Sequence, residues 1–166
     1  MLSANRFDEV IKNCQLLIQQ KSYSGEEGNV VKVIEEMMKS YDFDDIHIDK
    51  YGNIIGGIIG QHPGKTLIFD GHIDTVPVSE RDWKEKPYGA EIKDGKIYGR
   101  GTSDMKGAVA AMISAIGFYG QDNQRNFAGR IYVSCIVHEE CFEGVAARLV
   151  SERYKPDYVV IGEASE

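Results

Sequence analysis

The chain has 166 residues, and its 19 Lys or Arg against 26 Asp or Glu give a formal net charge of −7. This length suits one ordinary domain with a sizeable core. Fractions of 42% hydrophobic and 27% charged residues exclude a disordered chain or a coiled coil. The acidic balance argues against a nucleic-acid partner, and the apolar runs fall short of the roughly 20 residues of a membrane span.

The first residues carry no basic start followed by an apolar stretch, so no secretory signal is predicted. Three cysteines are an odd number and form no Cys-x-x-Cys pair. Both observations favour a reduced, cytoplasmic setting without a membrane partner.

The N-terminal part of the chain predicts two helices followed by strands. Apolar residues recur at steps of three and four from Phe7 to Ile18 and again from Val30 to Tyr41, with Ser22–Gly25 between the two stripes. The period then changes to two, which predicts strands at Ile46–Ile48 and Ile54–Ile59.

Strands and helices alternate along the rest of the chain. Pro63 and Gly64 indicate a loop over residues 61–65, and Asp94-Gly95 indicates a hairpin over residues 90–98. The remaining elements are strands at 66–69, 129–137 and 157–161, and helices at 104–119 and 144–154. This pattern predicts one α/β domain in three layers, α/β/α, with a mixed, mostly parallel sheet.

The first candidate site follows the apolar strand 66–69. His72 and Asp74 are two residues apart, so in an extended segment their side chains project to the same side. A carboxylate beside a histidine can fix its tautomer and raise its basicity as a metal ligand. The alternative is a strand-end histidine that a neighbouring carboxylate satisfies without any metal.

The second candidate site is Asp104 within the glycine-rich stretch from Gly99 to Gly107. Gly99 and Gly101 allow a tight backbone path. The stretch matches neither phosphate-binding template, and a carboxylate at position 104 would repel a phosphate, which argues for a cation instead. The alternative is an N-terminal carboxylate that complements the dipole of the following helix.

Two further acidic sites follow the later strands. Glu139 and Glu140 come after strand 129–137, and Glu163 comes after strand 157–161. Adjacent carboxylates repel each other unless a cation or a proton relieves them, although a solvated surface pair is the common alternative. Acidic groups with a histidine at several strand ends predict a site for Zn²⁺, Mn²⁺ or Co²⁺.

The strings FDGHIDTVP, GRGTSDMKG, HEE and GEAS, in this order, resemble the co-catalytic zinc hydrolases. That family includes acetylornithine deacetylase, succinyl-diaminopimelate desuccinylase, aminoacylase and carboxypeptidase G. The resemblance implies a zinc-exopeptidase-like fold and two Zn²⁺ ions, with Co²⁺ or Mn²⁺ also accepted. It implies one metal held by His72 and Glu163, a bridging Asp104, Glu140 on the second metal, Asp74 orienting His72, and Glu139 as the general base.

The resemblance also implies parts that these residues do not contain. Family members add a final histidine ligand and a lid or dimerisation domain, and His47 and His62 do not stand in for that ligand by motif. We therefore expect residues 1–166 to be the N-terminal, truncated part of a catalytic domain. The intact protein would be a homodimer that cleaves the amide bond of an N-acyl amino acid or small peptide.

Two other functions remain as alternatives. The chain could be a catalytically incompetent fragment that binds at most one metal firmly, through His72, Asp104 and Glu163. A nucleotide-binding α/β module is the third hypothesis, and Asp104 in the glycine-rich loop argues against it.

Overall fold

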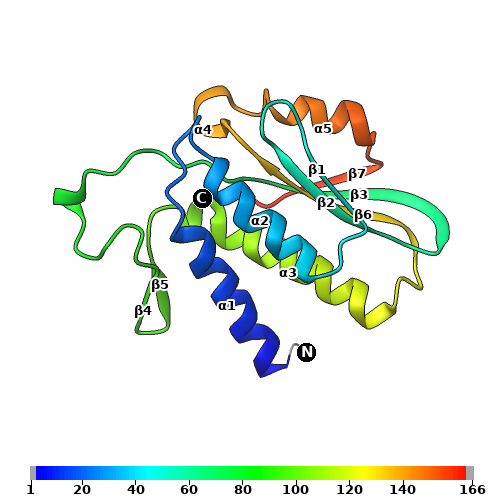
Figure 1. Cartoon of the computed structure of the whole chain (residues 1–166), viewed down its shortest axis with the longest axis horizontal. Coiled ribbons are helices and arrows are strands. Elements are labelled where there is room, and N and C mark those ends of the chain that lie inside the picture. Colours follow the sequence, from blue (N-terminus) through cyan, green and yellow to red (C-terminus); the bar gives the residue numbers. More distant parts are fainter. Residues whose placement is uncertain (1–2, 164–166) are drawn as a thin grey trace.

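The computed structural model of the chain describes residues 3–163, which form a five-stranded sheet with helices on both faces (Figure 1). The order across the sheet is β1 (Asp45–Ile48), β2 (Ile54–Ile59), β6 (Ala128–Ile136), β3 (His62–His72) and β7 (Tyr158–Ile161). The pairs β1–β2 and β2–β6 are antiparallel, whereas β6–β3 and β3–β7 are parallel. The sheet is mixed, as predicted.

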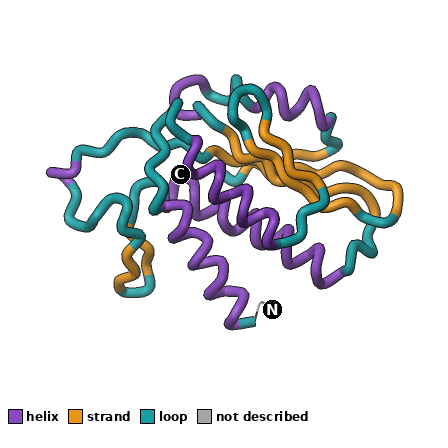
Figure 2. Tube along the Cα trace, viewed as in Figure 1, coloured by secondary structure: helices purple, strands orange, loops and turns teal. Residues whose placement is uncertain are grey.

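The helices form the outer two layers. Figure 1 shows α1 (Ala4–Ile18), α2 (Gly28–Ser40) and α3 (Gly107–Asn123) on one face of the sheet, and α5 (Ala147–Tyr154) on the other. Figure 2 shows the same separation of helical and strand layers by colour. The short helix α4 (Glu139–Phe142) follows β6 directly. The predicted α/β/α arrangement is confirmed.

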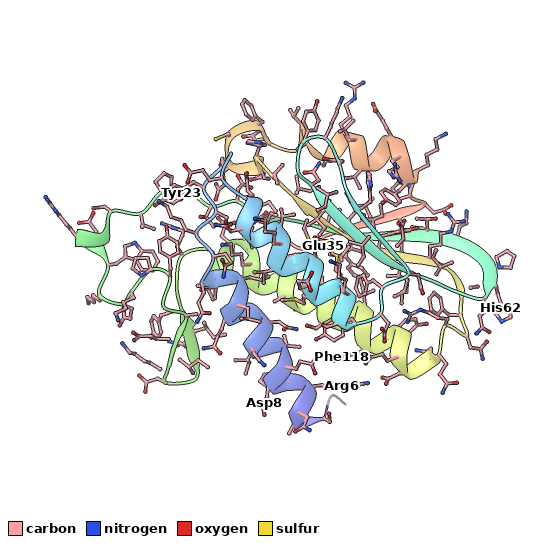
Figure 3. All side chains as sticks on the ribbon, in the orientation of Figure 1. Arg6, Asp8, Tyr23, Glu35, His62 and Phe118 are labelled. Atoms are coloured by element: carbon pink, nitrogen blue, oxygen red, sulfur yellow. The ribbon has the colours of Figure 1, made fainter. Side chains whose placement is uncertain are left out.

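The main hydrophobic core lies between the three helices and the sheet. The apolar stripes of α1 and α2 are buried there, and Leu17, Ile18, Ile34 and Met38 are fully inaccessible to solvent. At the other end of α1, the guanidinium of Arg6 lies 4.6 Å from the ring centre of Phe118 on α3 (Figure 3). The apolar residues that recur with a helical period in α1 and α2 are therefore those that contact the sheet and the neighbouring helices.

A small hairpin lies apart from the main sheet. It pairs β4 (Glu91–Lys93) with β5 (Lys96–Tyr98). Both residues of the turn, Asp94 and Gly95, have positive φ angles, of 50° and 72°. This is the backbone that an Asp-Gly hairpin favours, so the predicted hairpin is confirmed.

Several predicted boundaries are wrong: β3 continues past residue 69 to His72, the helix predicted to end at residue 119 continues to Asn123, and three others differ for the following reasons. Residues 62–65 belong to β3 and are not a loop, because His62 pairs with Ala128 before the register shifts ahead of Thr66. The third long helix begins at Gly107 and not at Asp104, whose φ and ψ are not helical. The helix predicted from residue 144 begins at Ala147, since Gly144 has a positive φ.

All three cysteines are free, with Cys14 and Cys135 buried and Cys141 exposed. Within residues 3–163, every helix is too short or too polar to cross a bilayer.

Candidate metal site

The candidate site lies where three neighbouring strands end. Because β6, β3 and β7 are mutually parallel, their carboxyl ends meet at one edge of the sheet, where open α/β sheets usually bind ligands. His72 is the last residue of β3, Glu139 and Glu140 follow β6, and Glu163 follows β7. Strand register thus brings together residues that lie up to 91 positions apart.

The imidazole of His72 is buried and held from both sides. Its Nδ1 lies 3.0 Å from the backbone oxygen of Asp74, and because a carbonyl oxygen only accepts, Nδ1 carries a proton. Its Nε2 lies 2.8 Å from Asp104 Oδ1 and 3.5 Å from Glu163 Oε2. When the ring is neutral, its Nε2 lone pair therefore faces two carboxylates.

This donor set fits a divalent cation. The ligand atoms of His72, Asp104 and Glu163 all lie within 4.8 Å of one another, and imidazole nitrogen with carboxylate oxygens suits zinc and similar metals. Burial lowers the pKa of His72, but Asp74 and Asp104 outweigh that effect and raise the pKa to about 9. The carboxylates therefore favour a positive charge at this point, whether a proton or a metal supplies it.

The backbone before α3 places the Asp104 carboxylate. Gly101 has a φ of 80°, and its carbonyl accepts a hydrogen bond from the backbone N–H of Lys106 at 2.7 Å. The ammonium of the fully buried Lys106 donates to the backbone oxygen of Gln20 at 2.6 Å. α3 begins only at Gly107, so Asp104 lies three residues before it, in the segment Thr102–Lys106, and its φ and ψ are not helical.

Asp74 is the most buried carboxylate of the site. It is fully inaccessible to solvent and accepts hydrogen bonds from Ser24 Oγ at 2.7 Å and from the backbone N–H groups of Glu139 and Glu140 at 3.1 Å each. Burial raises its pKa, but His72, Ser24 and the two amides more than compensate and hold the pKa below its usual range. Asp74 is therefore an anion that connects the His72 segment to α4.

Glu139 and Glu140 lie at the start of α4, at the rim of the same site. Burial raises the pKa of Glu139, and Glu163, Asp74 and Asp104 raise it further, partly offset by His72. For Glu140, burial again raises the pKa, with Asp104 the next cause. Within the described part of the chain, the compact three-residue group does not include Glu140.

A cleft of about 390 Å³ opens beside these groups. Its lining includes His72, Glu139 and Glu163, together with Gly144 and Ala147 near the start of α5. The cleft therefore leaves room for a small substrate next to the candidate metal ligands.

The structure also shows two site contacts that sequence analysis missed. Ser24 and Glu27 lie in the loop between α1 and α2, and their side chains contact Asp74 and the backbone of His138. In Figure 3, Tyr23 of this loop lies left of centre, whereas His62 lies at the right edge of the view. The signals in the sequence are a polar run between two amphipathic stripes and the string Ser24-Gly25-Glu26, which also resembles the co-catalytic zinc hydrolases but indicates no role for its residues. The end of the GEAS string, from Ala164, lies outside the described residues.

The comparisons with known proteins identify the family. Residues 68–166 match the model of peptidase family M20/M25/M40, which covers more than half of the chain. The chain therefore belongs to this family of hydrolases, and the resemblance noted in the sequence is confirmed.

Relatives and solved structures agree with this assignment. The chain is 31% identical to succinyl-diaminopimelate desuccinylase 2 of Ruegeria sp. (strain TM1040) over 98% of its own length and 43% of the relative's. It superposes with a TM-score of 0.81 on the M20 family metallo-carboxypeptidase Sso-CP2 from Sulfolobus solfataricus, at 22% identity, covering 95% of this chain and 38% of that one.

A third comparison concerns metal binding within the family. A dinuclear metal-binding M20 peptidase of Bacillus subtilis superposes with a TM-score of 0.68 at 16% identity, over 91% of this chain and 40% of that one. The chain spans less than half the length of each of these three proteins.

Proposed function

We propose that this chain is the N-terminal part of the catalytic domain of a metal-dependent hydrolase. Its substrate would be an N-acyl amino acid or a small peptide, cleaved at the amide bond. The observation that carries the proposal is the convergence of His72 Nε2, Asp104 Oδ1 and Glu163 Oε2 within 4.8 Å at the edge of a parallel sheet. The desuccinylase relative supports the acyl-amino-acid class.

The proposed metal centre holds two divalent cations, Zn²⁺ or else Co²⁺ or Mn²⁺. His72 and Glu163 would hold one, Glu140 the other, and Asp104 would bridge them. When bound, such cations lower the pKa of water and polarise an amide carbonyl. The chain spans only 43% of the desuccinylase relative. In this proposal, the rest of the protein supplies a histidine ligand, a lid domain and a homodimer contact. The protein would be cytoplasmic.

The chain's own residues would carry the proton. Asp74 holds the ring of His72 and the start of α4 in place, which sets Glu139 at the cleft. Glu139 takes a proton from the attacking water as the new C–O bond forms. It then delivers that proton to the amine nitrogen as the C–N bond breaks. A raised pKa makes the Glu139 carboxylate a stronger base for this step.

The test is Glu139→Ala in the whole protein loaded with Zn²⁺. We expect kcat for an N-succinyl or N-acetyl amino acid to fall by about 10²–10⁴-fold. Metal content, measured by atomic emission, should stay close to that of the wild type, because Glu139 is not a proposed ligand. Glu152→Ala on the exposed surface of α5 is the matched control. Full activity of Glu139→Ala at normal metal content would refute the proposed function.

A second candidate function rests on the single compact group of possible ligands within residues 3–163. In this case the 166-residue chain binds one cation through His72, Asp104 and Glu163 and does not hydrolyse substrate. Amide hydrolysis by the purified 166-residue chain would exclude this candidate.

A further inference from the structure

The first backbone N–H groups of α4 are satisfied by carboxylates from distant parts of the chain. Asp74 accepts from Glu139 and Glu140, and Glu27 Oε1 accepts from the backbone N–H of His138 at 3.1 Å. His138 precedes the helix with a φ of 60°, and its own side chain makes no capping hydrogen bond. The path of residues 138–140 therefore depends on contacts from outside the helix.

Glu27 is itself fixed in position. It is only 5% exposed, and the same Oε1 atom accepts a second hydrogen bond from the backbone N–H of Gly25 at 2.9 Å. Its backbone oxygen accepts from Val31 N at 3.0 Å in the first turn of α2. His138 Nδ1 also lies 3.9 Å from its carboxylate. A buried carboxylate that accepts two hydrogen bonds at the start of a helix has little freedom to move, so it can hold the backbone of His138 in place.

We propose that Glu27 is a positioning residue that sets the orientation of Glu139 through the backbone of His138. The inference rests on the proposed function, in which Glu139 is the general base. Movement of His138 would displace the next residue directly, because the two share a peptide bond. A displacement of about 1 Å in a catalytic group costs on the order of 10²-fold in rate. The neighbouring Glu26 is exposed and offers a matched control.

The experiment compares Glu27→Ala, Glu27→Gln and Glu26→Ala in the whole, Zn²⁺-loaded protein. Glu27→Ala removes the acceptor, so we expect kcat to fall by about 10–100-fold with KM within about twofold of the wild type. Glu27→Gln keeps an oxygen that can accept both N–H groups, so its kcat should stay within about threefold. Glu26→Ala should match the wild type. A purely structural role would not produce this division between kcat and KM or the rescue by Gln.

A double variant tests whether Glu27 acts through Glu139. Adding Glu27→Ala to Glu139→Ala should lower the residual rate by less than about twofold, because the base is already absent. If Glu27→Ala does not fold, Glu27→Asp takes its place: the shorter side chain withdraws the acceptor, and kcat should fall while Glu27→Gln retains it.

The outcomes separate the two proposals. Normal turnover in Glu139→Ala refutes the proposed function. Loss of turnover in Glu139→Ala, with every Glu27 variant as active as Glu26→Ala, overturns the positioning role and leaves the proposed function standing.

Discussion

A buried polar cluster of three side chains joins α1 to α3 through the residue that ends α2. Asn13 Nδ2 donates to Tyr41 Oη at 2.8 Å and to Ser114 Oγ at 3.0 Å, and Tyr41 Oη donates to Ser114 Oγ at 3.3 Å. Burial, with a smaller effect of Glu9, raises the pKa of Tyr41 to about 12. Each polar atom named here has a partner, which offsets the cost of its burial.

Tyr41 should make the fold sensitive to alkaline pH. In the unfolded chain a tyrosine loses its proton near pH 10, whereas folded Tyr41 keeps it to about pH 12. The folded state therefore favours a neutral Tyr41, and its contribution to stability declines as the pH rises from 10 to 12. We expect the melting temperature of Tyr41→Phe to fall less steeply over this range than that of the wild type.

Circular dichroism melts between pH 8 and 12 measure this difference. The control is Tyr51→Phe, because the Tyr51 side chain is 47% exposed. Parallel pH profiles for Tyr41→Phe and the wild type would contradict the prediction.

The candidate ligands could be predicted from the sequence, but their supports could not. His72 and Glu163 each come shortly after an apolar run, and Asp104 comes after the glycine pair Gly99 and Gly101. Ser24 and Glu27 act on partners 50 and 111 residues away, so their contacts exist only after the loop packs on the strand ends. No local pattern encodes contacts across such distances.

At the scale of elements, α3 packs closely because glycine faces a neighbouring ring. A Cβ atom added at Gly117 would lie 2.4 Å from Cγ of Tyr41, so only glycine fits against that ring. By contrast, an added Cβ at Gly28, in the first turn of α2, would meet no atom within 4 Å. Gly117 therefore allows α3 to pack closely on Tyr41, whereas Gly28 is not required by packing.

Alanine substitutions at these two positions should have opposite effects. Gly117→Ala should lower the free energy of unfolding by about 1–3 kcal/mol, because α3 and Tyr41 must separate. Gly28→Ala should leave it unchanged or raise it by up to about 1 kcal/mol, since Ala restricts the unfolded chain. Urea denaturation of the whole protein measures both. Equal stability of the two variants would show that α3 tolerates the extra methyl group.

Most element types were predictable, but several boundaries and the short helix α4 were not. Periodicity identified α1 and α2 because one face of each helix packs on the sheet or on α3. Pro63 and Gly64 indicated a loop, but pairing with β6 extends β3 back to His62 across a register shift. The non-helical turn at Asp104 was also missed, because it depends on Gly101 and the buried Lys106. Tertiary contacts overrode local preference in these places.

For the whole molecule, the main feature is the outer edge of β7. Its four residues, Tyr158–Ile161, are all apolar or aromatic and between 45% and 68% exposed. Within residues 3–163, no strand pairs with the edge of β7 that faces away from β3. An uncovered apolar edge strand is a site for association with another chain.

We therefore expect the isolated 166-residue chain to self-associate. Light scattering after size exclusion should show oligomers whose mass rises with concentration, and Val159→Lys should shift them towards monomer, because a charge on an edge strand opposes pairing. Ile92→Lys, in the exposed hairpin, is the control. A monodisperse wild-type monomer would be inconsistent with this prediction.

The position of Glu163 after β7 has a consequence for biosynthesis. Roughly 90 residues separate it from His72, and translation at about 5–20 residues per second places its synthesis some 5–20 s later. Until then the nascent polypeptide contains His72, Asp104 and Glu140 but not Glu163, so the compact group of three possible ligands is incomplete. If this group binds a metal as proposed, its three ligands are all present only after β7 has been synthesised.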